Sequence, residues 1–313
     1  MNLRHLRTFV AIADAGGVAR AASRLNMTQP TASRQILALE TELGVPLFDR
    51  IGRRIQLTSE GEDLLLRGRR LLSEADSLGE RARALKTGQT GVLRIGTTPQ
   101  AIESLLVGFL AHYRPRHPGV EIRLVEDGGV RLPARLERGD IHLSIMPEVD
   151  ERFHTRLLYP VYLMAVLPAA HPLSRRKVID VAQVSDDALL LLARGFASRE
   201  WFYAVCNVAH IRPRVFVESS APQTLIALAA AGYGIAVIPS SVLIPRDVRA
   251  VPLVHRGAPI GRWTITAWNP ERFLAPYAQD FVDELVAYTK RRFPNRDLVR
   301  RAPALPRPKQ SAI

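Results

Sequence analysis

Hydrophobic residues recur at helical spacing through the first 44 residues and predict three short helices. The first helix carries its apolar stripe at Leu3, Leu6, Phe9, Val10 and Ala13. Asn2 is suited to cap this helix and Gly16-Gly17 to end it. Residues 18–25 predict a second helix followed by Asn26, a residue that tolerates left-handed backbone.

The third predicted helix follows Thr28, which can cap it, carries Pro30 in its first turn and continues to Leu43. Two helices joined by so short a turn are typical of a helix-turn-helix, in which the second helix enters the DNA major groove. The side chains expected at the base edges lie in its first turns, at Gln29, Pro30, Thr31, Ser33 and Arg34. An ordinary helical hairpin with a polar outer face is the alternative.

A strand, a tight turn and a second strand follow in the run VPLFDRIGRRIQLTSEG, with the turn at Ile51-Gly52. This predicted wing carries Arg50, Arg53 and Arg54, which are suited to phosphate or minor-groove contacts. A solvated turn is the alternative.

A long helix is predicted from residue 59, where Ser59 and Glu62 form a capping box. Its leucines recur every seventh residue, at Leu64, Leu71, Leu78 and Leu85, with Ala75 and Ala82 on the intervening row. Such a heptad favours packing against another helix, so we expect residues 59–88 to form a homodimer interface. The alternative is a helix that lies on its own domain.

Strand and helix signals alternate over residues 91–270, as expected of an α/β domain. Strands are predicted at VLRIG, VEIRLVE, IHLSIM, YLMAVL, ALLLL, RVFVES, GIAVIP and RWTITAW, and helices over residues 99–112, 199–208 and 222–231. Crossovers expected near residues 159–163 and 265–268 divide the domain into lobe I (91–161 plus 267–292) and lobe II (162–266).

The formal net charge of +13 is concentrated at the two ends of the chain. Residues 1–90 carry net +4, residues 91–288 net +2 and residues 289–313 net +7. A basic N-terminal domain favours a polyanionic partner such as double-stranded DNA. The Pro- and Arg-rich composition of residues 293–313 predicts a disordered tail.

The chemistry that the sequence lacks narrows the class of protein. Cys206, the single cysteine, lies in an apolar helix and is interpreted as a core residue. The eight histidines form no metal-ligand cluster and no catalytic constellation is found, so neither an enzyme nor a metal or cofactor site is predicted. No transmembrane run or signal peptide is recognised, which predicts a cytoplasmic protein without membrane contact.

The motifs QPTASRQI, LE-x-x-LG-x-x-LF-x-R and LT-x-x-G stand in the order and spacing of the LysR-type transcriptional regulators. The chain resembles this family to about residue 292, through GVLRIGTTPQ, YRPRHPGVEI, LPAAHPL and AAGYGIAVIPSS. It departs in three features: Gly17 where a capping Ser is common, His142 where an Asp is usual, and a longer basic tail.

The resemblance implies a winged helix-turn-helix (1–58), a linker helix (59–90) and an effector-binding domain (91–292) of two α/β lobes like a type 2 periplasmic binding protein. It further implies a dimer of dimers, control by a small molecule bound between the lobes, and RNA polymerase as a candidate partner. We expect the effector to be a small anion or carboxylate, because the family cleft maps onto turns that begin helices. Its expected contacts are Thr97, Thr98, Gln100, Arg194, Phe196, Ser219 and Ser220, although helix capping alone would explain Thr98 and Ser220.

A transport-type solute-binding protein and a small-molecule α/β enzyme are the rival interpretations. The absent signal peptide and the helix-turn-helix disfavour the first, and the lack of an acid/base pair disfavours the second. The sequence therefore predicts a transcription regulator with a small-molecule input, and leaves the effector and the operator open.

Overall fold

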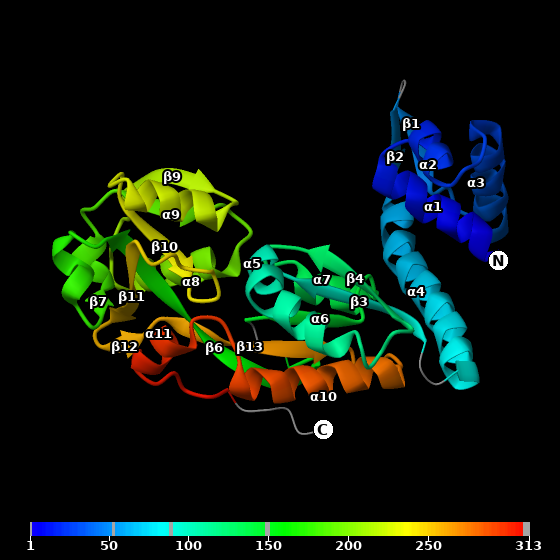
Figure 1. The fold of residues 1–313 in the computed structure, drawn as a ribbon. Helices are drawn as coiled ribbons and strands as arrows, with labels where there is room; N and C mark the ends of the chain where they lie inside the picture. Colours follow the sequence, from blue (N-terminus) through cyan, green and yellow to red (C-terminus); the bar gives the residue numbers. More distant parts are fainter. Residues whose placement is uncertain (1, 52–53, 88–89, 148–150, 309–313) are drawn as a thin grey trace. The chain divides into compact units, whose positions relative to one another are not determined.

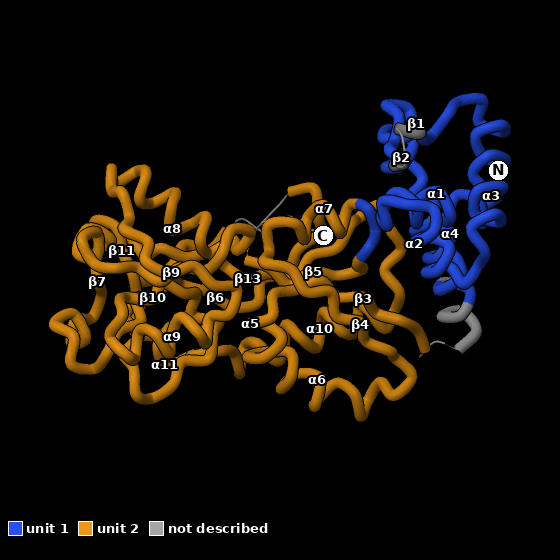
Figure 2. Tube along the Cα trace, turned by 90° about the horizontal axis from the view of Figure 1, so that it is seen from above, with its two compact units in different colours: residues 1–82, 138–140 blue, residues 83–137, 141–313 orange. Residues whose placement is uncertain are grey.

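The computed structural model describes residues 2–51, 54–87, 90–147 and 151–308. The chain divides into two compact units, residues 1–82 with 138–140 and residues 83–137 with 141–313 (Figure 1 and Figure 2). Within the described ranges, no helix is long and apolar enough to cross a bilayer.

The N-terminal unit is a three-helix domain with a two-stranded wing and a long final helix. Its elements are α1 (Leu3–Ala15), α2 (Val18–Arg24), α3 (Gln29–Leu43), β1 (Phe48–Ile51), β2 (Arg54–Leu57) and α4 (Ser59–Thr87). Two predicted caps are confirmed, since the Asn2 side chain accepts from Arg4 N and the Thr28 side chain accepts from Thr31 N. Asn26 has a φ of 52°, the left-handed backbone that the sequence predicted after α2.

The expected capping box of α4 is wrong by one residue. Thr58 is the residue that caps this helix: its Oγ1 accepts from Gly61 N at 2.8 Å and donates to Pro46 O at 2.8 Å. The Ser59 hydroxyl instead donates to Glu60. Thr58 rather than Ser59 caps the helix because its hydroxyl also bonds to Pro46 O at the base of the wing. This hydrogen bond joins residues that are 12 positions apart in the chain.

The C-terminal unit is built on a mixed sheet of 11 strands within the described residues. Lobe I contains β3 (Gly91–Thr97), α5 (Pro99–Ala101), the π-helical turn η1 (Ile102–Leu106), α6 (Val107–Tyr113), β4 (Val120–Glu126), α7 (Leu132–Arg138), β5 (Leu143–Met146), β13 (Gly261–Trp268) and α10 (Pro276–Arg291). Lobe II contains η2 (Pro172–Arg175), β7 (Ile179–Asp180), η3 (Val181–Val184), β8 (Leu189–Leu192), α8 (Ala197–Val208), β9 (Val215–Ser219), α9 (Pro222–Ala230), β10 (Ile235–Pro239), β11 (Val248–His255), β12 (Ala258–Pro259) and α11 (Arg296–Arg301).

One long strand, β6 (His154–Pro168), belongs to both lobes because its two halves pair with different strands. Residues 154–162 pair with β13, and residues 163–168 pair with β10 or β11. The chain returns to lobe I at Gly261, before the stretch 265–268 where the sequence placed the crossover, since β13 pairs with β6 from its first residue.

Helices cover both faces of the sheet in each lobe (Figure 1). In lobe I, α6 and α10 share one face, where Phe109 meets Phe281 edge-to-face at 5.0 Å, and α7 lies on the other. In lobe II, the run of leucines in β8 alternates between the α8 side and the α9 side of the sheet. A strand buried on both faces needs apolar residues at every position, which explains this run.

The basic segment after α10 is packed against the protein as far as residue 308, in contrast to the disordered tail expected from composition. Phe293 stacks on Tyr159 with ring centroids 5.5 Å apart, and Val299 of α11 is buried in the lobe II core. The Arg307 guanidinium lies 5.4 Å from the centre of the Trp263 ring. The apolar residues dispersed in this segment find partners in both lobes.

Candidate functional site

The first turns of α3 present polar side chains, two of which have no partner among the described residues. Gln29, Pro30 and Arg34 are exposed, and Thr31 and Ser33 are half-buried beside them. Among the described residues, neither Gln29 nor Arg34 has a side-chain hydrogen bond or ion pair. A free amide and a free guanidinium on one helix end can bond bidentately to the edges of bases.

Two side chains of α3 that the sequence did not single out hold this helix in place. Gln35 Oε1 accepts from the Thr8 hydroxyl of α1 at 2.6 Å. Glu40 Oε1 accepts from Leu47 N at 2.8 Å and from Phe48 N at 3.2 Å, which ties the start of the wing to α3. Glu40 therefore fixes the start of the wing against α3.

The predicted wing is an antiparallel hairpin, in which Ile51 pairs with Arg54 and Arg50 with Ile55. This register brings the backbone of Arg50 and Arg54 to the tip of the hairpin. Arg53, the third predicted wing arginine, lies outside the described residues.

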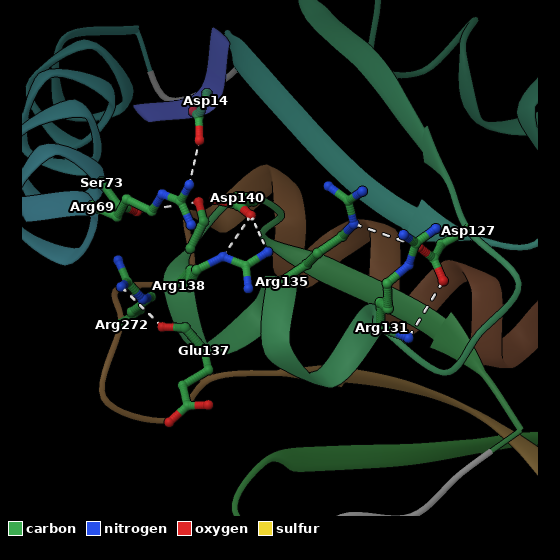
Figure 3. A network of polar contacts seen from close by, with 11 residues as sticks. Asp14, Arg69, Ser73, Asp127, Arg131, Arg135, Glu137, Arg138, Asp140 and Arg272 are labelled. Atoms are coloured by element: carbon green, nitrogen blue, oxygen red, sulfur yellow. Dashed lines mark hydrogen bonds and ion pairs between the residues drawn. The ribbon is translucent and has the colours of Figure 1, made fainter. Parts of the chain in front are cut away.

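The long helix α4 contacts its own domain with one face only. Leu64 and Leu72 pack against the core of the N-terminal unit, and Arg69 pairs with Asp14 of α1 (Figure 3). Leu71 and Leu78 remain 42% and 69% exposed. The side chain of Leu85, the last leucine of the predicted heptad, is outside the described part of the chain.

A small cavity lies between lobes I and II. Its volume is about 30 Å³, and its walls include Thr98, Gln100 and Gly128 from lobe I and Phe196, Ser198 and Ser241 from lobe II. Such a volume holds about two water molecules. The two lobes therefore leave little room between them at this point.

Polar groups that face this cavity lack partners. Gln100 is 3% exposed, and its Nε2 makes no hydrogen bond. Ser198 and Ser241 are also buried, and neither hydroxyl has a bond among the described residues. A buried donor without an acceptor costs about 1–3 kcal/mol, so Gln100 Nε2 favours a ligand that brings an acceptor atom, and the two hydroxyls are placed to bond to the same ligand.

The lobes touch through their backbones beside the cavity. Ala197 N donates to Gly128 O at 3.1 Å. A Cβ on Gly128 would lie 2.1 Å from Gly195 O, so only glycine permits this approach.

A buried carboxylate shapes the glycine turn from within lobe I. Asp127 Oδ1 accepts from Gly129 N at 3.2 Å. Its other oxygen pairs with Arg131 at 3.0 Å and with Arg135 at 3.7 Å (Figure 3). Asp127 therefore fixes the conformation of the turn that meets lobe II, a role that no sequence motif indicated.

Two family models match this chain: "Bacterial regulatory helix-turn-helix protein, lysR family" over residues 3–62, and "LysR substrate binding domain" over residues 86–290. The chain belongs to the LysR family of bacterial transcription regulators. The predicted fold, an α/β protein with an N-terminal helix-turn-helix and a substrate-binding domain, is thereby confirmed.

Relatives of this LysR-family chain are regulators rather than enzymes. The transcriptional regulator AlsR of Bacillus subtilis is 33% identical over 249 residues, 77% of this chain and 81% of that protein. IlvR of Caulobacter vibrioides is 35% identical over 264 residues, 81% and 88% of the two chains. The crystal structure of full-length CbnR complexed with its target DNA matches with a TM-score of 0.64 and 26% identity, over 92% of this chain and 100% of that one.

The structure brings three of the seven predicted effector contacts of this LysR-family domain to the cavity, namely Thr98, Gln100 and Phe196. Thr98 also caps α5, since its hydroxyl accepts from Ala101 N at 3.3 Å. The same residue therefore caps the helix and lines the cavity. The Thr97 hydroxyl instead donates to Ile145 O at 3.1 Å within the sheet.

The remaining predicted contacts lie outside the cavity wall. Ser219 Oγ accepts from Ala221 N at 3.1 Å in the turn before α9, and Ser220 and Arg194 are exposed. The sequence analysis did not single out Ser198 and Ser241, because no local pattern distinguishes them from the other serines of the chain.

Arg199, the neighbour of Ser198, anchors the start of α8. Its guanidinium donates to Leu192 O at 2.7 Å and to Glu218 Oε1 at 2.5 Å, and lies 5.1 Å from the Tyr203 ring centre. The hydrogen bond from Arg199 lowers the pKa of Glu218. This pair joins α8 to β9 behind the cavity.

His142 and Cys206 are structural residues. Burial, and then the charges of Arg94 and Arg272, lower the pKa of His142 to about 3, and its Nδ1 lies 3.3 Å from Arg94 N as an acceptor. A neutral imidazole thus accepts a backbone hydrogen bond where an Asp is usual in the family. Cys206 is fully buried, and burial raises its pKa to about 11, as expected of a core thiol.

Proposed function

We propose that this regulator reads double-stranded DNA with the first turns of α3 and is controlled by a small carboxylate, or another small anion, bound between its two lobes. The observation that supports the effector proposal is the unpaired amide nitrogen of Gln100 in the small cavity between the lobes.

For the DNA contact, the free side chains of Gln29 and Arg34 suit adenine and guanine edges in the major groove. Pro30, Thr31 and Ser33 complete the surface that meets the bases. Arg50, Arg53 and Arg54 of the wing supply phosphate or minor-groove contacts, which add affinity more than sequence choice.

For the effector, Gln100 Nε2 and the hydroxyls of Ser198 and Ser241 offer hydrogen bonds to carboxylate oxygens. A ligand larger than about two waters requires the lobes to open and then close around it. Its binding energy therefore favours one lobe arrangement over another, which is the physical requirement for a switch. Thr97, Arg194, Ser219 and Ser220 stay predictions for a form with opened lobes.

For the assembly, the exposed stripe of Leu71 and Leu78 supports a homodimer through α4, which would present two copies of α3 to two half-sites. A dimer of dimers remains a prediction from the family resemblance.

Thermal unfolding of the full chain tests the effector proposal. The probes are acetate, pyruvate, succinate and benzoate at equal ionic strength, with acetamide and benzamide as neutral controls. We expect at least one carboxylate to raise the Tm, because a ligand at 100 times its Kd stabilises by about 2.7 kcal/mol. Gln100→Leu should remove the shift, and Gln279→Leu on α10 should retain it. A shift that survives Gln100→Leu, or the absence of any shift, refutes the assignment.

The DNA part is tested separately by gel shift with the intergenic DNA beside this gene. We expect a complex that weakens steeply as salt is added. No salt-sensitive complex would contradict the proposed reader.

A further inference from the structure

Lobe II carries a second hollow that shares no wall residue with the cavity between the lobes. It is a surface groove of about 1020 Å³. Its walls are formed by Ser174, Arg176 and Lys177, by residues 244–246 and 248–252, and by Leu298 and Arg301 of α11. Leu298 and Arg301 come from the segment after α10, which packs on lobe II.

The rim of the groove is strongly basic. It carries Arg176, Lys177, Arg246, Arg249 and Arg301, all exposed. No carboxylate belongs to the wall, and none of these five side chains has an ion pair among the described residues. Asp247 and Asp297 are near in the chain but do not border the groove.

This concentration of charge is local. Four of the five rim residues belong to residues 91–288, which as a whole carry a net charge of only +2, and Arg301 comes from the basic segment that follows. Like charges around one hollow repel each other, and no carboxylate in the described part of the chain borders the groove to offset that repulsion. A multivalent anion would remove it.

The floor of the groove is apolar. Ile244, Val248, Val251 and Leu298 contribute to it. Along residues 248–252, β11 pairs with β6 alone, so its other edge carries no strand in the described structure. A cationic rim above an aliphatic floor suits a ligand that has anionic groups attached to a less polar organic framework.

We propose that this groove is a binding site for a small organic polyanion with two or more phosphate or carboxylate groups. The guanidinium groups of the rim match such groups bidentately, and the body of the ligand lies on the apolar floor. The volume is near the upper end of small-molecule sites, roughly 300–1,000 Å³, so a lone phosphate would leave most of it unfilled. The site is independent of the proposed effector cleft.

Titration calorimetry of the full chain tests this site with inorganic triphosphate, ATP and citrate. Arg246→Gln with Arg249→Gln removes two rim charges. Arg212→Gln with Arg214→Gln is the matched control, because these arginines are exposed on the same lobe and border neither hollow. All four positions are exposed, so both variants should keep the circular dichroism of the parent chain.

We expect triphosphate to bind, and ATP to bind more tightly through its body. The rim variant should weaken both by about tenfold or more, since a charge-assisted hydrogen bond contributes about 1.5–3 kcal/mol. The control should change them less than about twofold, a loss typical of distant exposed charges. Equal weakening in both variants, or no binding of any probe, overturns the proposal. A rim-dependent affinity for random duplex DNA or poly-glutamate without any for the small probes overturns it as well.

Discussion

Asn295 attaches the C-terminal segment to lobe II, and Asn295→Asp should destabilise the effector domain. Its Nδ2 donates to Ser240 O at 2.8 Å and to Val242 O at 2.6 Å. Its φ of 49° is left-handed, a conformation that Asn and Asp both tolerate. The substitution therefore keeps shape and backbone preference while it removes both donors and sets a negative charge against two carbonyl oxygens.

The magnitude follows from the burial of the two acceptors. Ser240 and Val242 are each 1% exposed, so their carbonyls have little access to water. An unsatisfied buried acceptor costs about 1–3 kcal/mol, and Asn295 itself is half-buried, which admits some water. We expect a loss of about 2–4 kcal/mol, or roughly 5–15 °C in Tm for a domain of this size. Asn295→Gly removes the donors without adding a charge, so its loss of unfolding free energy should be smaller than that of Asn295→Asp.

Urea unfolding followed by tryptophan fluorescence is the assay. Trp201, Trp263 and Trp268 are the only tryptophans of the chain and belong to the C-terminal unit, so the signal reports on that unit alone. Asn207→Asp on the exposed side of α8 makes the same chemical change and should cost less than about 0.5 kcal/mol. If Asn295→Asp unfolds at the urea concentration of the parent, or no earlier than Asn207→Asp, the segment is not held as described.

Three further outcomes are expected. Arg34→Ala should weaken operator binding in gel shifts by about 1–3 kcal/mol per contact and leave random DNA nearly unchanged; equal losses on both would contradict base reading. Leu78→Glu should dissociate the dimer in sedimentation velocity, whereas Leu66→Glu, off the heptad stripe, should not. His142 has a native pKa of about 3 against about 6.5 unfolded, so it contributes stability above pH 6.5 that is lost as pH falls toward 3. In His142→Gln, the urea midpoint of unfolding should fall less steeply with decreasing pH than in the parent chain. An equally steep fall in both proteins would refute this role of His142.

Local structure was predictable where one short segment determines it. The Thr28 cap, the left-handed Asn26 and the leucine run of β8 all follow from neighbouring residues. The first residue of α4 could not be predicted in this way, because Thr58 and Ser59 are equally good helix caps when each is considered alone. The contact of Thr58 with Pro46 O decides between them, and that contact depends on the wing having folded.

The candidate effector site was predictable to the same extent. Thr98 and Gln100 belong to a strand-turn-helix that the sequence displays. Ser198 lines the cavity from the first turn of α8, and Ser241 does so from the residues that follow β10. Neither segment carries a sequence motif that indicates a binding site. Which turns meet across the lobes depends on the pairing of β6, and pairing between distant strands is not encoded in the periodicity of either strand.

The C-terminal segment shows why composition alone misleads. Its excess of Arg and Pro predicted disorder, yet Phe293 stacks on Tyr159, a residue that also lines the cavity between the lobes. A few apolar residues with buried partners outweigh many solvated charges, because exposed charges contribute little to stability while each buried aromatic or aliphatic side chain contributes about 1.5–3 kcal/mol. Tyr159 lies on β6, more than 120 residues earlier in the chain. Residues 293–308 therefore pack as part of the effector domain, and removal of residues 293–313 should alter the cavity wall as well as the charge of the protein.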